Sequence, residues 1–139
     1  MKVLVADKIS DTGIEKLRAD GYEVDVKTGL TEDELVAIIA DYDAMIVRSA
    51  TKATRPIIEA GAKLKIIGRA GVGIDNVDVA AATERGVIVC NAPTSNIVSA
   101  AEQTITLMLA TARNTAQANA SMKQGKWERS KFTGTEVYE

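Results

Sequence analysis

Apolar residues gather in five short runs that recur at nearly even spacing along the 139-residue chain. Each run is rich in β-branched side chains, and runs of this length and composition are typical of β-strands. Two of them, residues 3–6 and 44–47, are apolar throughout, as expected of strands that are covered on both faces of a sheet. The predicted strands cover residues 2–6, 23–26, 44–47, 64–67 and 87–90.

The segments between the strands carry apolar residues at helical spacing. Helix start and stop signals are also in place. Thr31 and Glu34 form a capping-box pair, Pro56 stands in a first helical turn, and Gly21 and Gly86 follow helix ends. The predicted helices cover residues 12–19, 32–40, 55–60, 77–85 and 115–124, and a further helix starts near Ile97.

Strand and helix alternate, and this order predicts parallel βαβ units with right-handed crossovers. Five such units favour a flavodoxin-like α/β fold, in which a five-stranded parallel sheet of order 2-1-3-4-5 has helices on both faces. We expect residues 1–96 to form this domain. Residues 97–139 are expected to supply one or two helices and a polar tail, because residues 126–139 show no periodicity.

Composition narrows the possible functions. The chain has 17 basic and 19 acidic residues, a net charge of −2 and no histidine. This balance does not favour bulk binding to nucleic acid or to an anionic membrane, and neither a histidine acid nor a metal site is expected. Without a signal-peptide pattern or a bilayer-length apolar run, a cytoplasmic location is expected. The single cysteine, Cys90, is expected to be a buried, non-catalytic thiol.

Two arginines follow neighbouring strands of the predicted sheet. Arg48 comes directly after residues 44–47, and Arg69 follows residues 64–67. The carboxyl ends of parallel strands meet at one edge, where ligands of such folds bind, so both guanidiniums should face one crevice. Because like charges repel unless an anion lies between them, the pair predicts a carboxylate or phosphate site. Lys52 could add a third positive group.

An alternative is that both arginines are surface residues paired with nearby acids such as Asp43, Asp75 or Asp78.

The loop after the fourth predicted strand is rich in glycine. Its spacing is G-x-x-G-x-G, whereas a dinucleotide fingerprint reads G-x-G-x-x-G after the first strand of its fold. Gly71 and Gly73 are therefore expected to let the backbone approach a ligand and expose amides, or to serve only a turn. Asp75 or Asn76 is expected to cap the next helix.

Two further polar segments have more than one interpretation. Residues 91–96 join the fifth strand to the next helix, and Ser95 or Asn96 could cap that helix or contact a ligand. Trp127 with Arg129 and Lys131 could bind an anion or another subunit, or could simply pack on the surface.

Four strings together are specific enough to indicate a family. They occur in the family's order, cover the whole chain, and resemble the NAD-dependent D-2-hydroxyacid dehydrogenases. The last string favours the phosphoglycerate branch of that family. The strings are VRSATK (47–52), GRAGVGIDNVD (68–78), NAPTSN (91–96) followed by SAAE (99–102), and SMKQGKWERSKFTGTE (121–136).

The resemblance implies a two-domain, homo-oligomeric enzyme (a dimer or tetramer) that oxidises 3-phosphoglycerate to 3-phosphohydroxypyruvate with NAD, on the route to serine. It implies a discontinuous, flavodoxin-like substrate domain. It also implies a role for each matching residue. Arg48 and Ser49 would hold substrate, and Arg69 with the backbone of Ala70 and Gly71 would lie near its anionic groups. Val72 would border the nicotinamide. Asn96 would lie at the hinge side of the cleft, and Arg129 would reach the phosphate of a neighbouring subunit's substrate.

The family's dinucleotide fingerprint and its catalytic arginine, glutamate and histidine have no counterpart in these 139 residues. We therefore expect a substrate-binding fragment of a longer enzyme with no catalytic residue of its own. Alone, it should be inactive, bind 3-phosphoglycerate weakly and not bind NAD tightly.

Other interpretations remain open. The chain could be the substrate domain of another D-2-hydroxyacid dehydrogenase, a stand-alone anion-binding flavodoxin-like module, or a folding or assembly module. A phospho-receiver is disfavoured because that class needs an acidic pair after the first strand and an aspartate after the third, where this chain has Asp7-Lys8 and Arg48. A flavodoxin is disfavoured because no aromatic residue follows the third strand to stack on a flavin.

Overall fold

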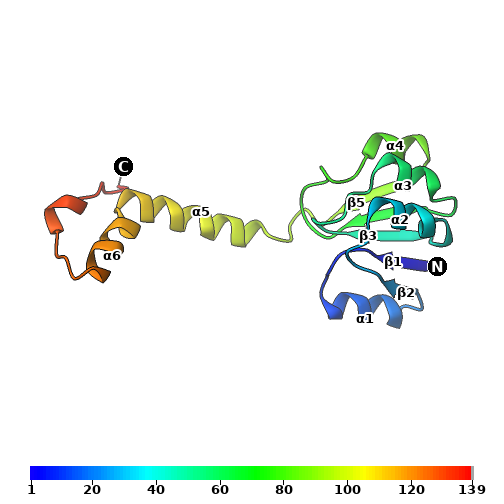
Figure 1. The fold of residues 1–139 in the computed structure, drawn as a ribbon, viewed down its shortest axis with the longest axis horizontal. Helices are drawn as coiled ribbons and strands as arrows, with labels where there is room; N and C mark the ends of the chain where they lie inside the picture. Colours follow the sequence, from blue (N-terminus) through cyan, green and yellow to red (C-terminus); the bar gives the residue numbers. More distant parts are fainter. Residues whose placement is uncertain (139) are drawn as a thin grey trace. The chain divides into compact units, whose positions relative to one another are not determined.

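The computed structural model describes residues 1–138. The chain divides into two compact units, Met1–Ser95 and Asn96–Glu139, and each unit is described by itself (Figure 1).

The first unit is built on one parallel sheet whose strand order is β2-β1-β3-β4-β5. This order confirms the predicted flavodoxin-like arrangement. The fourth strand begins two residues later than predicted, because the Leu64 amide closes a turn onto the Gly61 carbonyl and pairing starts where Ile66 meets Ala44. The strands are β1 (Lys2–Val5), β2 (Glu23–Val26), β3 (Ala44–Val47), β4 (Ile66–Arg69) and β5 (Ile88–Asn91).

The helices of this unit lie where the periodicity predicts them. The Thr31–Glu34 capping box is present, with the Glu34 carboxylate 2.8 Å from the Thr31 amide. The expected cap of the fourth helix is wrong: Asp78, rather than Asp75 or Asn76, accepts from the Ala81 amide at 2.8 Å. The elements are α1 (Asp11–Ala19), α2 (Glu32–Ile38), a 3-10 turn (Ile39–Asp41), α3 (Arg55–Ala60) and α4 (Val79–Glu84).

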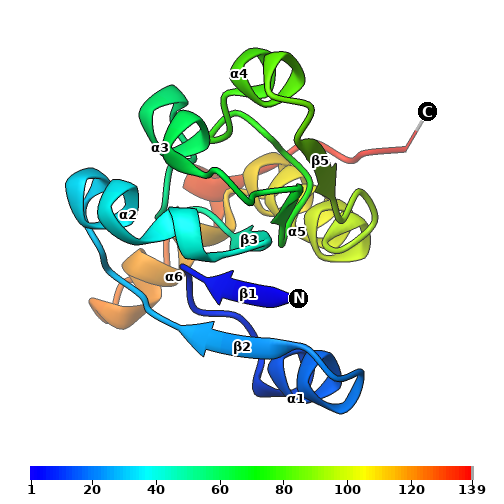
Figure 2. The ribbon, with the colours of Figure 1, turned by 90° about the vertical axis from the view of Figure 1, so that its right-hand side faces the viewer.

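Helices cover the two faces of the sheet unequally. Figure 2 shows α2, α3 and α4 on one side and α1 on the other. The larger core cluster lies on the three-helix side and includes the fully buried Leu4, Met45 and Ile67. The smaller one contains Val3, Val5, Ile14, Val24 and Ala44.

The side of the sheet that carries α1 is left partly open. Since α1 packs beside β2, a hollow of about 300 Å³ remains, lined by residues that include Ile46, Ile66 and Cys90. Ile88 of the edge strand β5 is 62% exposed. The prediction of a buried Cys90 is wrong for this reason. Helix α4 contacts β5, and Val89 packs into the larger core cluster, whereas Cys90 lines the hollow on the other face and is exposed.

The second unit consists of α5 (Ile97–Ala112), α6 (Thr115–Lys123) and a 3-10 turn (Arg129–Phe132). Asn114 has a φ of 50° and makes the sharp turn between α5 and α6. No residue of α5 is buried. None of the helices within residues 1–138 is both long and apolar enough to cross a membrane.

Candidate functional site

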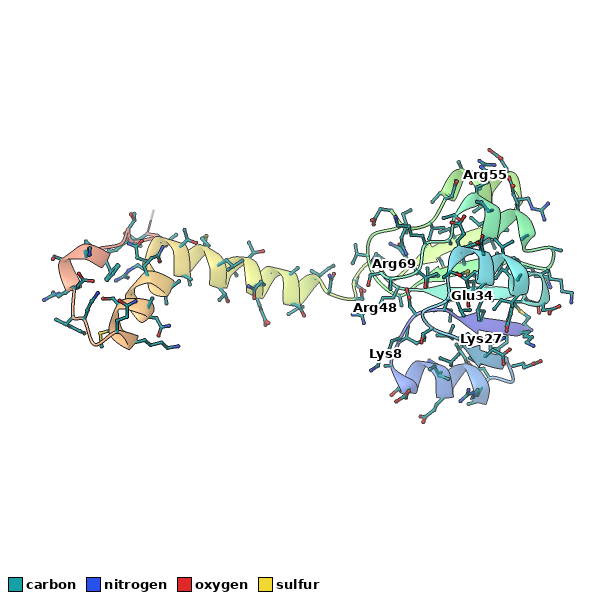
Figure 3. The ribbon with its side chains drawn as sticks, in the orientation of Figure 1. Lys8, Lys27, Glu34, Arg48, Arg55 and Arg69 are labelled. Atoms are coloured by element: carbon teal, nitrogen blue, oxygen red, sulfur yellow. The ribbon has the colours of Figure 1, made fainter. Side chains whose placement is uncertain are left out.

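The two arginines of the sequence analysis meet at the carboxyl edge of the sheet. Arg48 follows β3 directly, and Arg69 is the last residue of β4, in register with Val47. The Arg69 Nε atom donates a hydrogen bond to the Arg48 carbonyl at 2.9 Å. Figure 3 shows the two side chains next to each other, far from Arg55. The geometry therefore places two guanidinium groups at one edge, as strand order predicted.

Nearby acids do not neutralise this pair. Among residues 1–138, no ion pair involves Arg48 or Arg69. Asp43 pairs instead with Lys65 at 3.0 Å, at the opposite end of β3. The interpretation of the arginines as ion-paired surface residues thus receives no support, and two uncompensated guanidiniums are suited to bind an anion bidentately.

The turn after β3 (residues 48–51) rests on the buried carboxylate of Asp7, which is 5% exposed. This carboxylate accepts hydrogen bonds from the Arg48 amide at 2.6 Å, the Ala50 amide at 3.2 Å, and the amide and hydroxyl of Thr51 at 3.1 and 2.7 Å. Burial opposes ionisation of Asp7, but the hydrogen bonds together outweigh it and hold its pKa below the ordinary value. Asp7 is therefore a buried anion that fixes the backbone at Arg48.

Asn76 holds the same turn through its carbonyl groups. Its Nδ2 atom donates to the Arg48 oxygen at 3.1 Å and to the Thr51 oxygen at 2.7 Å. Its backbone oxygen accepts from the Ala53 amide at 2.8 Å, next to an isolated parallel bridge between Ala53 and Val77. The loop after β4 is thus joined to the turn after β3 at several points.

The sequence pattern predicts no site role for Asp7 or Asn76. From the sequence alone, Asp7 is a poor match to a receiver site and Asn76 is a candidate helix cap. The available signal for Asp7 was an acid placed directly after a strand that is apolar throughout.

Gly71 leaves room for the Arg69 side chain. A Cβ atom on Gly71 would overlap the Nη1 atom of Arg69. The expectation of an exposed amide is wrong at Gly71, because this amide donates to the Arg69 carbonyl at 2.9 Å. The neighbouring Ala70 amide donates to the Val47 carbonyl at 2.8 Å. The glycine here makes space for a guanidinium.

The remaining predicted residues of the first unit lie around this edge. Ser49 is an exposed residue of the turn itself. Lys52 is also exposed and lines a shallow hollow with Asp75 and Asn76. Val72 is 39% exposed, and its carbonyl accepts from the Asn91 side chain at 2.6 Å.

These residues do not fit the phosphates of a dinucleotide. The glycine spacing after β4 differs from the fingerprint, and α4, the helix that follows, begins only at Val79 and has six residues. Neither Gly71 nor Gly73 has a positive φ. Within residues 1–138, the first unit therefore offers the nicotinamide cofactor no phosphate loop.

Asn96 and Arg129 belong to the second unit. Asn96 is the N-cap residue of α5, as predicted for Ser95 or Asn96, but its side chain makes no capping hydrogen bond. Arg129 begins the 3-10 turn and is exposed, and Trp127 is 77% exposed. Lys131 pairs with Glu128 at 3.0 Å.

Comparison with known proteins gives a consistent result. The chain is 55% identical over 137 residues to a D-3-phosphoglycerate dehydrogenase of Synechocystis, covering 99% of this chain and 24% of that protein. It is 54% identical to a D-3-phosphoglycerate dehydrogenase of Archaeoglobus fulgidus, covering 99% of this chain and 26% of that protein. The chain thus spans about a quarter of the length of these relatives.

One solved structure is similar to this chain in both sequence and fold. The NAD+-bound 3-phosphoglycerate dehydrogenase of Entamoeba histolytica superposes with a TM-score of 0.71 at 33% identity, over 81% of this chain and 39% of that one. The family model described as D-isomer specific 2-hydroxyacid dehydrogenase, catalytic domain, matches residues 3–132. From this match and the fold, we conclude that the chain belongs to the family of D-isomer specific 2-hydroxyacid dehydrogenases.

Proposed function

We propose that the first unit is the substrate-binding domain of an enzyme that oxidises 3-phosphoglycerate to 3-phosphohydroxypyruvate with NAD, the reaction that opens the phosphorylated route to serine. The relatives named D-3-phosphoglycerate dehydrogenase, 54–55% identical over nearly the whole chain, support this proposal. In it, the parent enzyme is a cytoplasmic homo-oligomer.

The observation that carries the proposal is the pair of guanidiniums at one sheet edge, joined through the Arg69 Nε bond to the Arg48 carbonyl. 3-Phosphoglycerate has a carboxylate at one end and a phosphate at the other. Two arginines with no acidic partner among residues 1–138 can each take one anionic group. Ser49 and Lys52, both exposed beside the pair, add a hydroxyl and an ammonium donor.

In this proposal the first unit binds and orients the substrate and does not hold the cofactor. Bound NAD would supply the hydride acceptor, and Val72 is the residue that we assign to its nicotinamide border. We assign no residue of this chain to accept the proton of the substrate hydroxyl group. Asn96 is assigned to the hinge side of the cleft, and Arg129 to the phosphate of a neighbouring subunit's substrate.

The proposal is tested by two NMR titrations of the labelled chain, first with 3-phosphoglycerate and then with NAD. We expect 3-phosphoglycerate to shift the amides of Arg48, Arg69 and Gly71 with millimolar affinity, and NAD to cause little change. Weak binding is expected because a small contact surface offsets little of the entropy of association. Tight NAD binding, or no response to 3-phosphoglycerate, would contradict the proposal. Equal affinity for inorganic phosphate would instead favour a generic anion-binding module.

Replacing Gly71 with alanine is expected to weaken binding of 3-phosphoglycerate about five- to tenfold, because the new methyl group displaces the Arg69 guanidinium. The free energy of unfolding should change by less than about 1 kcal/mol, since the overlapping atom ends a flexible side chain and Gly71 lacks a positive φ.

Gly73→Ala is the matched control for this variant. Its Cβ would approach the Asp75 carboxylate at 2.8 Å instead of an arginine. Equal weakening in both variants would show that loop distortion, rather than the space for Arg69, is responsible.

A further inference from the structure

The turn at residues 48–51 is held from two sides by side chains that do not belong to the arginine pair. We propose that Asp7 and Asn76 are positioning residues, which fix this turn so that Arg48 and Arg69 face the two anionic groups of one ligand. This inference rests on the proposed function, because the ligand it concerns is the phosphorylated hydroxy acid.

Asp7 organises the amide side of the turn. Four donors converge on its carboxylate: the amides of Arg48, Ala50 and Thr51, and the Thr51 hydroxyl, which also lies 3.2 Å from the Ala6 carbonyl. A carboxylate has two oxygens that only accept, so it can satisfy all four donors at once. Neither an amide nor a hydroxyl side chain could do so, because each also brings a donor of its own.

Asn76 organises the carbonyl side. Its Nδ2 atom bonds the carbonyls at the two ends of the turn, those of Arg48 and Thr51. The Arg48 carbonyl also receives the Arg69 Nε bond, so one oxygen is shared by Asn76 and Arg69. The orientation of the Arg69 guanidinium is therefore tied directly to the position of the turn.

Because Asp7 is charged, an electrostatic role and a positioning role predict opposite changes in ligand affinity when it is replaced. A carboxylate beneath an anion site opposes anion binding through Coulomb repulsion. If Asp7 influenced the ligand only through its charge, Asp7→Asn would strengthen binding. If Asp7 positions the turn, the same variant weakens binding. The side-chain NH2 group of asparagine is a donor, and it would face backbone and hydroxyl groups that are donors too.

The experiment measures 3-phosphoglycerate binding and amide hydrogen exchange by NMR in the whole chain, for the wild type, Asp7→Asn and Asn76→Ala. We expect each variant to bind at least about tenfold more weakly, and the amides of Arg48, Ala50 and Thr51 to exchange faster in Asp7→Asn. The Asn76→Ala change alters no charge, so weaker binding there has no electrostatic explanation. In that variant, the signal of the Arg69 Nε proton should also shift.

Asp43→Asn is the matched control. Asp43 likewise accepts a backbone amide, that of Lys2 at 2.9 Å, but it precedes β3 at the other end of the strand. This variant removes the same charge, a comparable hydrogen bond and the ion pair with Lys65, and its affinity should stay within about twofold of the wild type. If Asp7→Asn does not fold, Thr51→Val removes only the hydroxyl donor and is expected to weaken binding about threefold.

Tighter or unchanged binding in Asp7→Asn, or in Thr51→Val if it replaces that variant, would overturn the inference, as would equal weakening in Asp43→Asn. Faster exchange without weaker binding would also overturn it. If the wild-type chain binds no 3-phosphoglycerate, the proposed function fails and the inference fails with it. If the wild type binds and the variants bind equally well, only the inference fails.

Discussion

An Arg69→Ala variant is expected to bind 3-phosphoglycerate about 10- to 100-fold more weakly than the wild-type chain. Hydrogen bonds to a charged group are worth about 1.5–3 kcal/mol each, and about 1.4 kcal/mol corresponds to a factor of ten in affinity. Arg48→Ala should have an effect of similar size. Its backbone carbonyl remains, so the Arg69 Nε bond is kept and only the Arg48 guanidinium is tested.

Arg85→Ala is the control for this pair. Arg85 is exposed at the C-terminal cap of α4, before β5 begins, and so lies away from the carboxyl edge. Its loss changes the net charge equally and should leave affinity within about twofold, as expected for a distant screened charge. Unchanged binding in both site variants, measured by NMR titration, would rule out the two-arginine site.

The second large effect concerns stability. Ile67→Ala is expected to lower the free energy of unfolding by about 3–4 kcal/mol, because Ile67 is fully buried in the cluster beneath α2, α3 and α4. Its neighbour Ile66 points to the opposite face and is only partly buried. Ile66→Ala should therefore cost only about 1 kcal/mol.

The two variants form a matched pair on one strand, measured by urea unfolding. Equal losses would mean that the two faces of the sheet are equally well packed, contrary to the structure.

Much of the fold could be predicted from local sequence. Apolar runs and helix caps depend on neighbouring residues, so they predict where strands and helices lie. The alternation of strand and helix was then sufficient to predict the strand order. The limits of β4 could not be predicted in this way, because Leu64 and Ile66 are both apolar and only pairing with Ala44 decides which residue begins the strand.

The arginine pair could also be predicted, since each arginine lies at the end of its own strand. The residues that hold the turn beside that pair, Asp7 and Asn76, could not be predicted. Asp7 and Thr51 are separated by 44 positions in the sequence, and Asn76 and Arg48 by 28. Contacts of this kind depend on how distant loops meet in three dimensions, which no local pattern records. Cys90 was predicted wrongly for a related reason, because its burial depends on which helix covers the strand rather than on its own sequence.

The half-open face of the sheet makes Cys90 a chemical reporter. It is the only cysteine in the 139 residues, it is exposed, and it lines the hollow beside β4 and β5. A thiol-alkylating reagent would therefore modify one known site on this face without any prior mutation. Anything laid over the hollow, whether another segment of a longer chain or a second molecule, would slow that reaction. The labelling rate thus measures how completely this face of the sheet is covered.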